Sequence, residues 1–361
     1  MGRRASLTPD GRRSILVIRL SAIGDCVMTS AAVTALRRAC PDDYIAWVVE
    51  PKSAPVVVGN RYVDDVLLWE RDTHGYFSPG AVLSLKQRLA PFGVDIALDF
   101  QGLARCALIA ATSGASKRVA FADAREGATI AANYLVSTAR ASESVIQRNL
   151  RFLEAIGIES PVGECHVPVS AEGRAEFGSL MDRLGHDGGP LLGLHLKGSW
   201  AHKFWPTDRW ATVAEMAVER WGLRPMILGG PADRHDAAAL VEACRAPLLD
   251  TVGELSLAGS VAAIEQCGAV IGPDTGTIHI SGALGVPTVC LFGPTRPELV
   301  TPPGEHVRSL IHRMPCHPCV RRPICRHYDC MLGLETEWVI DALDDLMTRY
   351  PPQSRRARKD P

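Results

Sequence analysis

The sequence predicts an α/β protein made of two doubly wound domains, each with a parallel β-sheet between helices. Short apolar segments of strand length alternate with segments of helical periodicity, and this alternation runs through the chain in two successive series. The chain has 361 residues, and at about 150 residues per domain this length favours two domains over one. Apolar residues make up 47% of the chain, which excludes a wholly disordered protein or a fibrous rod.

The first series opens with a strand–turn–helix–strand unit. Residues 14–20 form an apolar run rich in β-branched side chains, which is typical of a buried strand. Residues 21–24 form a turn, residues 25–39 follow as a helix with Asp25 at its start, and residues 44–49 form the next strand. A unit of this kind places the two strands parallel, with a right-handed crossover.

The alternation continues, and a region rich in helix breakers separates the two series. The further strands expected in the first series are residues 66–68, 96–99 and 118–121, and the further helices are 81–89, 103–110 and 145–156. Residues 159–168 have no clear period, a helix is expected at 174–184, and glycine and proline cluster at 185–190. The linker is predicted in this region, between a first domain at 14–170 and a second at 187–334.

The second series repeats the pattern. Its expected strands are residues 191–196, 225–228, a short one near 248, 269–271 and 288–292, and its expected helices are 208–220, 233–244, 257–267 and 335–350. In doubly wound sheets, ligands bind outside the carboxyl ends of the strands. The sequence therefore predicts a ligand site at these ends, in a cleft between the two domains.

Charge and composition exclude several classes of protein. Lys and Arg number 39 against 40 Asp and Glu, so the chain lacks the basic excess of a dedicated nucleic-acid binder. Aromatic residues are only 6%, too few for a surface that stacks on RNA bases. No uninterrupted apolar run approaches the ~18 residues of a membrane span, and the basic N-terminal residues lead into a strand rather than a signal-peptide core. A cytoplasmic chain is expected.

The most informative segment is Gly272-Pro-Asp-Thr-Gly-Thr-Ile-His279, which follows a strand and opens a helix. The free N–H groups and the dipole of a helix N-terminus attract an anion. Thr275 and Thr277 add hydroxyl donors, and His279 lies in the first helical turn. The segment is typical of a diphosphate cradle. The alternative is an ordinary helix start, capped by Asp274 or Thr277, with His279 as a packing residue.

A second segment, His195 to Pro206, lies between the first strand and the first helix of the second domain. Lys203 in this loop can reach a phosphate as a point charge. Gly198 and Ser199 would add N–H and hydroxyl groups. The alternative interpretation of Lys203 is a solvated loop lysine.

The loop after the first strand, residues 19–25, carries a carboxylate at the start of a helix. Gly24 permits a tight turn, and Asp25 is either the N-cap or a general base that takes a proton from an acceptor hydroxyl. The loop lacks G-x-G-x-x-G, and the chain lacks G-x-x-x-x-G-K-[ST]. Nicotinamide or flavin sites and P-loop nucleotide sites are therefore not supported.

Taken together, these segments resemble glycosyltransferase family 9, the ADP-heptose:lipopolysaccharide heptosyltransferases. The resemblance is carried by residues 15–25, by Lys203-Phe-Trp-Pro206 with its preceding loop, and by residues 272–279 continuing through Phe292-Gly-Pro-Thr295. It covers nearly the whole chain. It implies a GT-B fold, in which two Rossmann-like domains face each other, the first binding the acceptor and the second the nucleotide sugar. It also implies that the last helix, 335–350, packs back on the first domain.

The resemblance further implies an inverting transfer of a heptose from ADP-heptose to the inner core of lipopolysaccharide. Asp25 matches the catalytic base, and Lys203 matches a lysine on the diphosphate, with Gly198 and Ser199 in the same loop. The positions that match the nucleotide-phosphate motif are Asp274, Thr275, Gly276 and His279. The alternatives are a member that uses another nucleotide sugar or acceptor, an epimerase of similar shape, or a catalytically silent paralogue that binds nucleotide sugar.

Two features depart from or add to the family pattern. The acidic residue expected to hold the adenosine ribose does not align clearly, and Asp233 is the first candidate, with Asp236 the second. The family commonly has Ser or Thr at the position of Ala22. No Asp-x-Asp motif is present, so no cofactor or essential divalent ion is expected for catalysis.

A cysteine cluster is the remaining candidate for a metal centre. Cys316 and Cys319 form C-x-x-C, and Cys325 and Cys330 follow after five and four residues. Four thiolates at such spacing could hold a structural zinc ion or an iron–sulfur centre. The alternative is a loop of reduced thiols. A similar cysteine-rich loop occurs in the heptosyltransferase II branch of the family that this chain resembles, and this likeness does not imply a catalytic metal.

Both ends of the chain are basic. The residues concerned are Arg3, Arg4, Arg12, Arg13, Arg355, Arg356, Arg358 and Lys359. These residues either form solubilising tails or attract the chain weakly to anionic lipid on the inner face of the inner membrane, where a lipid-linked acceptor would lie.

Overall fold

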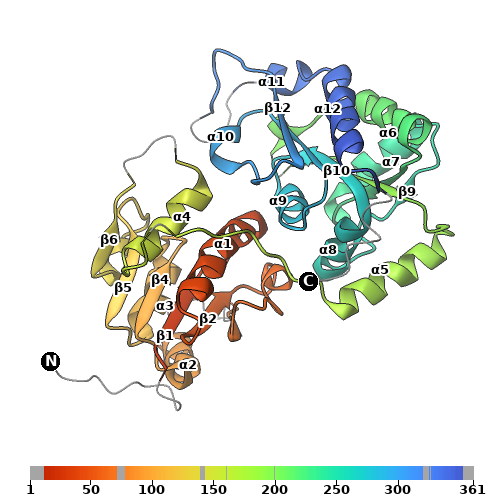
Figure 1. Cartoon of the computed structure of the whole chain (residues 1–361). Coiled ribbons are helices and arrows are strands. Elements are labelled where there is room, and N and C mark those ends of the chain that lie inside the picture. Colours follow the sequence, from red (N-terminus) through yellow and green to blue (C-terminus); the bar gives the residue numbers. More distant parts are fainter. Residues whose placement is uncertain are drawn as a thin grey trace. The chain divides into compact units, whose positions relative to one another are not determined.

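The computed structural model describes residues 12–70, 78–138, 143–159, 161–198, 200–319, 325 and 327–352. The chain divides into two compact units, Met1–Pro168 and Val169–Pro361 (Figure 1). Helix α5 (Ala171–Arg183) lies in the region predicted to hold the linker, and it belongs to the second unit.

The first unit is a six-stranded parallel sheet in the order β3-β2-β1-β4-β5-β6. Its strands are β1 (Ser14–Ile18), β2 (Tyr44–Val49), β3 (Asp65–Leu68), β4 (Ile96–Asp99), β5 (Lys117–Phe121) and β6 (Tyr134–Val136). The strand order reverses between β1 and β4. In a doubly wound sheet, the crevice at such a switch point is where ligands bind.

The described residues of this unit form the α-helices α1 (Ile23–Ala39), α2 (Pro79–Leu89) and α3 (Ala104–Thr112) between strands, and α4 (Val145–Glu154) after β6. Short 3₁₀ helices are η1 (Ala54–Val56), η2 (Ala90–Phe92) and η3 (Ala128–Ala131). Leu16 and Ile18 of β1 pack in one core cluster with Leu85 of α2 and Ile109 of α3. The alternate residues of β1 are also fully buried and face the opposite side of the sheet. Helices α1 and α4 pack against each other.

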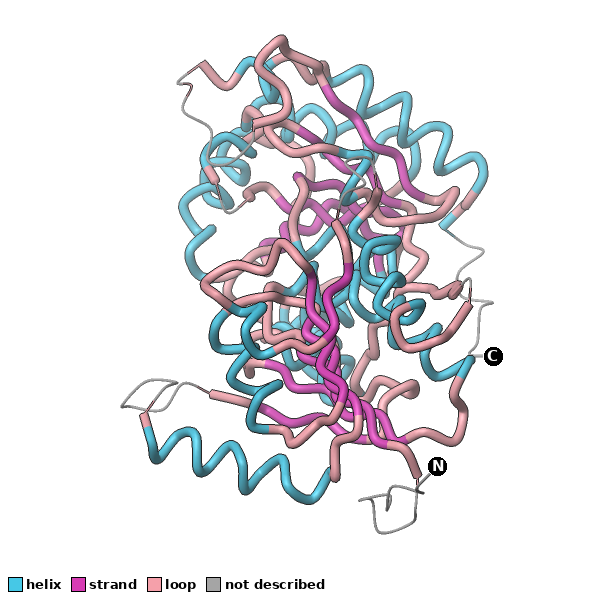
Figure 2. The backbone as a smooth tube through the Cα atoms, turned by 90° about the vertical axis from the view of Figure 1, so that its left-hand side faces the viewer, coloured by secondary structure: helices cyan, strands magenta, loops and turns pink. Residues whose placement is uncertain are grey.

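The second unit repeats this topology with the strand order β12-β11-β10-β7-β8-β9, again all parallel. Its strands are β7 (Leu191–His195), β8 (Arg224–Leu228), β9 (Leu249–Asp250), β10 (Cys267–Pro273), β11 (Thr288–Phe292) and β12 (Val307–Ile311). The switch point lies between β7 and β10. Figure 2 shows the strands of each sheet side by side, with helices around them.

The helices of the second unit, besides α5, are α6 (Thr207–Trp221), α7 (Arg234–Ala243), α8 (Leu257–Gln266), α9 (Gly276–Ala283), α10 (Pro297–Val300), α11 (Asp329–Leu332) and α12 (Thr336–Arg349), with 3₁₀ helices η4 (Ala201–Lys203) and η5 (Pro231–Asp233). Val339 and Leu343 of α12 lie in one core cluster with Leu194 of β7 and Trp210 of α6. The apolar face of α12 is thus used by the second unit, and its packing on the first domain stays a prediction.

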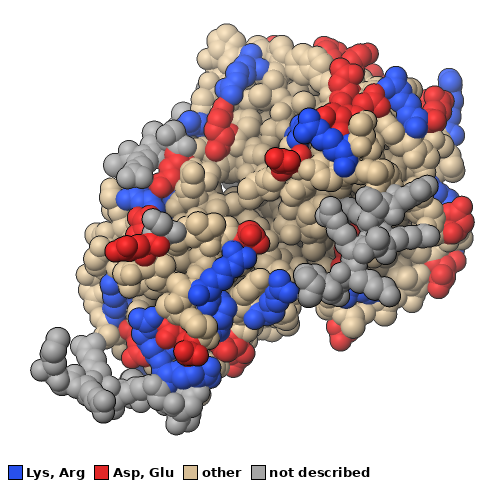
Figure 3. Space-filling view, viewed as in Figure 1, with Lys and Arg blue, Asp and Glu red and all other residues tan. Residues whose placement is uncertain are grey.

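Charged side chains of both signs are interspersed on the visible surface of each unit (Figure 3). Two of the basic residues near the N-terminus are paired within the first unit: Arg13 Nη2 lies 2.5 Å from Asp43, and Arg12 Nη1 lies 4.0 Å from Asp64. The other basic residues of the two ends, Arg3, Arg4, Arg355, Arg356, Arg358 and Lys359, lie outside the described residues. Every described helix is too short or too polar to cross a membrane.

Candidate active site

A buried ion pair lies at the carboxyl ends of three adjacent strands of the second sheet. Lys203 Nζ donates to Asp274 Oδ2 at 2.8 Å and to the carbonyl oxygen of Asp274 at 2.6 Å. Thr295 Oγ1 donates to the same carboxylate oxygen at 2.9 Å. Lys203 follows β7, Asp274 follows β10 and Thr295 follows β11, so the sheet order brings three distant segments together.

Burial gives this pair its electrostatic character. Lys203 is 7% exposed, so the interpretation as a solvated loop lysine is wrong. His279 Nε2 lies 3.5 Å from Asp274 Oδ1. Burial alone would raise the pKa of Asp274, but the hydrogen bond from His279 and the positive charge of Lys203 outweigh it, and the pKa is held well below its ordinary value. Asp274 is therefore an ionised anchor for Lys203, Thr295 and His279.

The first turn of α9 contains buried polar atoms without a hydrogen-bond partner among the described residues. Its N-cap is Thr275, which makes no side-chain bond to the helix, whereas the alternative interpretation gave the cap to Asp274 or Thr277. Within the described part of the chain, Thr275 Oγ1 and His279 Nδ1 are buried and have no hydrogen-bond partner. Because unpaired buried polar atoms are costly, such atoms at a helix N-terminus indicate a ligand site.

Thr277 makes a contact that the sequence did not suggest. Its Oγ1 lies 3.3 Å from Nδ1 of His195, at the end of β7. His195 is partly buried, and the loss of water around its ring lowers its pKa, which favours the neutral imidazole. No role for His195 was predicted from the sequence. The only available signal was its place at the end of a predicted strand.

Gly198 lies directly over the stem of Lys203. A Cβ at this position would come within 2.6 Å of Lys203 Cβ and 2.7 Å of its Cδ. Glycine is therefore required for the close approach that holds Lys203 on Asp274. Ser199, the other predicted loop residue, lies outside the described residues.

The two candidates for a ribose ligand lie at the carboxyl end of β8. Asp233 Oδ2 accepts a hydrogen bond from the N–H of Gly230 at 2.9 Å. Asp236 Oδ2 is 3.0 Å from Nζ of Lys197, and that ammonium also lies 5.1 Å from the ring centroid of Phe204. Both carboxylates are partly exposed, and each retains one oxygen outside these bonds.

In the first unit, Asp25 stands in the first turn of α1, not at its N-cap. The helix begins at Ile23 with Ala22 as N-cap, so it starts two residues earlier than predicted. Asp25 Oδ2 accepts a hydrogen bond from the N–H of Ala22 at 3.4 Å and forms an ion pair with Nη2 of Arg19, 2.5 Å away. The carboxylate is 38% exposed, so Arg19 orients it and leaves it accessible.

The loop after β4 holds the Arg19 loop in place across the switch point. Arg19 Nη1 donates to the carbonyl oxygen of Phe100 at 2.6 Å, and Gln101 Oε1 accepts from the N–H of Leu20 at 2.8 Å. Asp99 Oδ1 accepts from the N–H groups of Gln101 and the following glycine at 3.0 and 2.9 Å. Burial raises the pKa of Asp99 to about 6. Sequence reasoning missed these roles, because strand order decides them.

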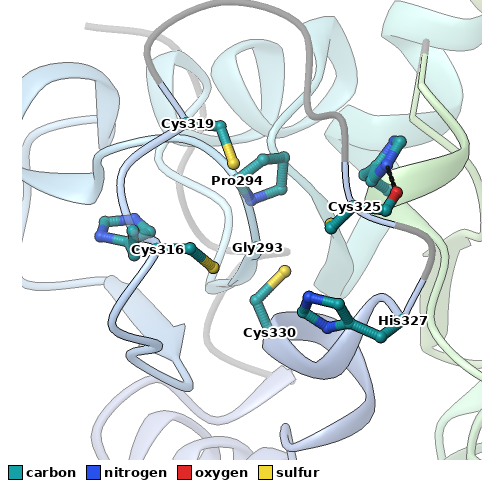
Figure 4. Close-up of a pocket in the computed structure, with 9 residues that line it drawn as sticks. Gly293, Pro294, Cys316, Cys319, Cys325, His327 and Cys330 are labelled. Carbon is teal, nitrogen blue, oxygen red and sulfur yellow. Dashed lines mark hydrogen bonds between the residues drawn. The ribbon is translucent and has the colours of Figure 1, made fainter.

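The four clustered cysteines line one small pocket with His202, His317, His327, Gly293 and Pro294 (Figure 4). All four are free thiols. Among the described His, Cys, Asp and Glu side chains, no group of three or more is already arranged as a metal site. The cofactor prediction for this cluster therefore stays a prediction.

Comparison with known proteins agrees with the predicted fold and family. A family model for glycosyltransferase family 9 (heptosyltransferase) matches residues 82–327. Lipopolysaccharide heptosyltransferase 1 of Pseudomonas aeruginosa is 29% identical over 325 residues, which cover 85% of this chain and 86% of that protein.

Two solved structures share the fold at 21% sequence identity. A family 9 glycosyltransferase from Veillonella parvula has a TM-score of 0.82 over 93% of this chain and 98% of its own. An Escherichia coli heptosyltransferase with ADP-2-deoxy-2-fluoro heptose has a TM-score of 0.69 over 92% of this chain and 99% of its own. The two six-stranded parallel sheets are those of the GT-B fold. Because the family model covers more than half of the chain, this protein belongs to glycosyltransferase family 9 and is a glycosyltransferase.

Proposed function

We propose that this enzyme transfers a heptose from ADP-heptose to the inner core of a lipopolysaccharide, with inversion at the anomeric carbon. The observation that carries the proposal is the buried Lys203–Asp274 pair beside the unpartnered polar atoms of α9, in a chain of this family. The similarity to a lipopolysaccharide heptosyltransferase supports the acceptor, and the heptosyltransferase solved with an ADP-heptose analogue supports the donor.

The donor diphosphate binds Lys203 and the N-terminus of α9. Two bonds of Lys203 Nζ go to Asp274, which leaves the third N–H of the ammonium for a phosphate oxygen. The hydroxyl of Thr275 is an unpaired donor that a phosphate oxygen can accept from, and the unpaired Nδ1 of His279 lies in the same first turn of the helix. Asp274 itself does not bind the phosphates, because two anions repel; it positions the groups that do.

The nucleoside is held at the end of β8. Asp233 is the first candidate for the ribose hydroxyls, and Asp236 is the second. A carboxylate accepts two hydroxyl hydrogen bonds well, and both residues have an oxygen to spare.

Asp25 is the general base in this mechanism. The acceptor hydroxyl oxygen attacks the anomeric carbon as the bond from that carbon to the ADP oxygen breaks, and the hydroxyl proton passes to Asp25. The electron pair of the broken bond stays on ADP. Lys203 and the α9 N-terminus stabilise the charge that develops there. As proposed, this chemistry calls on no cofactor.

The acceptor is lipid-linked, so the enzyme works at the inner face of the inner membrane as a peripheral cytoplasmic protein. The support for this location is the basic composition of the chain ends, which would add weak attraction to anionic lipid. Arg12 and Arg13 are already paired, so the attraction falls to the other basic residues.

The test is a transfer assay with ADP-heptose and a heptose-deficient lipopolysaccharide, read by ADP release and by the mass of the acceptor. Asp25→Asn is expected to abolish transfer while ADP still binds. Asp42→Asn, an exposed aspartate between α1 and β2, is the matched control. Full transfer by Asp25→Asn would exclude the proposed base. Transfer from another nucleotide sugar in place of ADP-heptose would exclude the proposed donor.

A further inference from the structure

Four thiols from a short stretch of chain converge on one pocket of the second unit. Figure 4 shows the sulfur atoms of Cys316, Cys319 and Cys330 directed into the same space in front of Gly293, with Cys325 on the far side. The pocket has a volume of about 10 Å³, which is about the space of one water molecule. This space suits a single ion.

The chemistry of the lining points to a soft metal ion. Four thiolates around one centre form the preferred tetrahedral ligand set of Zn²⁺. The spacing C-x₂-C-x₅-C-x₄-C lets two ligands come from the loop after β12, one from the segment before α11 and one from α11 itself. Because no three of the described side chains already stand in a metal-binding arrangement, the thiols must draw together when the ion binds.

The pocket is tied to the loop of Lys203. His202 lies in the pocket and its Nε2 donates to the carbonyl oxygen of Cys325 at 2.9 Å. Its ring lies 4.7 Å from the ring of Tyr328, between the third and fourth cysteines. Lys203 is the next residue along the chain, so the cysteine segment holds the backbone from which Lys203 reaches Asp274.

The pocket is also tied to the loop of Thr295. Cys319 donates its N–H to the carbonyl oxygen of Pro294 at 3.0 Å, and a ring nitrogen of His317 lies 2.9 Å from the carbonyl oxygen of Thr295. Thr295 in turn donates to Asp274. The cysteine segment therefore contacts the backbone at or next to two partners of Asp274, Lys203 and Thr295.

We propose that Cys316, Cys319, Cys325 and Cys330 bind one Zn²⁺ ion, which fixes the loops of Lys203 and Thr295 around Asp274. The ion is structural and positions the donor site without touching the substrate. The coupling to the donor site rests on the proposed function, whereas the ion and its ligands do not.

The first test measures metal in the full-length protein, purified without chelator from cells supplied with both zinc and iron. Inductively coupled plasma mass spectrometry is expected to find one zinc per chain in the wild type and in the control Cys244→Ser, whose thiol lies outside the cluster. Cys319→Ser, at a partly exposed ligand, is expected to lose the zinc. After exchange into Co²⁺, the wild type should show thiolate-to-cobalt charge-transfer bands. Metal-free wild type, stoichiometric iron, or two disulfides among the four cysteines would each overturn the assignment.

The second test measures the coupling. Removing zinc with a chelator is expected to weaken ADP binding, measured by calorimetry, by roughly tenfold. It should raise the KM for the donor more than it lowers kcat, and adding Zn²⁺ back should restore both. Unchanged ADP affinity in the zinc-free protein would overturn the positioning role. Failure of the zinc-loaded wild type to bind ADP at all would instead count against the proposed donor site and leave the zinc count standing.

Discussion

Lys203 and Asp274 form a buried ion pair, with Nζ 2.8 Å from Oδ2, at the point where β7 and β10 lie side by side. The two residues are 71 positions apart in the chain. A second bond from Nζ to the carbonyl oxygen of Asp274 fixes the direction of the ammonium. In the proposed mechanism, Asp274 positions the groups of the donor site, and Lys203 is the group that contacts the phosphates.

A double-mutant cycle on this pair tests that division of roles. Asp274→Ala leaves the Lys203 ammonium buried without a counter-charge, and is expected to lower the free energy of unfolding by about 3 kcal/mol or more. In the double variant with Lys203→Met, no charge is left unpaired, so the loss should be much smaller than the sum of the single losses. Urea unfolding at neutral pH measures all four proteins, and additive losses would contradict the coupling.

ADP binding by the same variants separates the two roles. Lys203→Met should abolish most of the ADP affinity, and Lys86→Met, an exposed lysine on α2, is its control. If Lys203→Met binds ADP as the wild type does, Lys203 is a structural residue only.

The buried carboxyl of Asp99 predicts an unusual dependence of stability on pH. Its pKa is about 6 in the folded protein, against about 3.9 in an unfolded chain. Between these values the folded state binds more protons, so the free energy of unfolding falls as pH rises, by up to roughly 3 kcal/mol for this group. The pKa of Asp274 is shifted in the opposite direction, and its stabilisation is lost only in stronger acid.

Asp99→Asn isolates this effect. The amide oxygen can still accept the N–H groups of Gln101 and Gly102, but the group no longer ionises. The stability difference, variant minus wild type, should therefore become more positive from pH 4 to pH 6.5, as measured by urea unfolding. Asp42→Asn should give a curve parallel to that of the wild type. A parallel curve for Asp99→Asn as well would show that Asp99 does not titrate in this range.

Gly198 supplies a prediction on close packing. In Gly198→Ala the new methyl group would meet the Lys203 stem at 2.6 Å, so Lys203 must move away from Asp274. The KM for the donor should rise, and stability should fall by roughly 1–3 kcal/mol. The control is Gly178→Ala on α5, where a Cβ meets nothing within 4 Å and stability should be unchanged or higher. An unchanged KM for the donor in Gly198→Ala would contradict the claim that Lys203 needs a glycine at position 198 to reach Asp274.

The sequence pattern correctly predicted the strands that form uninterrupted apolar runs. The apolar runs of β1, β7 and β11 are fully buried or nearly so, and they were found. Strands β6 and β12 were missed: both are edge strands with exposed or partly exposed residues, β6 has only three residues, and polar residues interrupt β12. Helix α1 was placed two residues late, because Asp25 resembles an N-cap in sequence but stands in the first turn.

The loops that carry Lys203 and Asp274 were identified from the sequence, since small residues after a strand mark a ligand loop. Their pairing was not identified, and neither was the support of the Asp25 loop by Gln101. Both depend on which strands are neighbours, and no local pattern encodes strand order. The spacing of the four cysteines was visible in the sequence. Their contact with His202 appears only because β7 and β12, which precede the two segments, lie in one sheet.

Arg19 links the predicted base to the scaffold of the first unit. One of its nitrogens pairs with Asp25 and another donates to the carbonyl oxygen of Phe100. A lysine cannot make this forked pair of contacts, so Arg19→Lys should leave the Asp25 carboxylate misoriented. The expected result is a fall in kcat of at least roughly tenfold, about 1.4 kcal/mol of transition-state stabilisation. ADP affinity should be unchanged, because the proposed ADP site lies in the second unit. Steady-state transfer kinetics and calorimetry measure the two quantities, with the exposed Arg38→Lys as control. An unchanged kcat, or a loss of ADP binding equal to the loss of rate, would contradict a role for Arg19 in orienting the base.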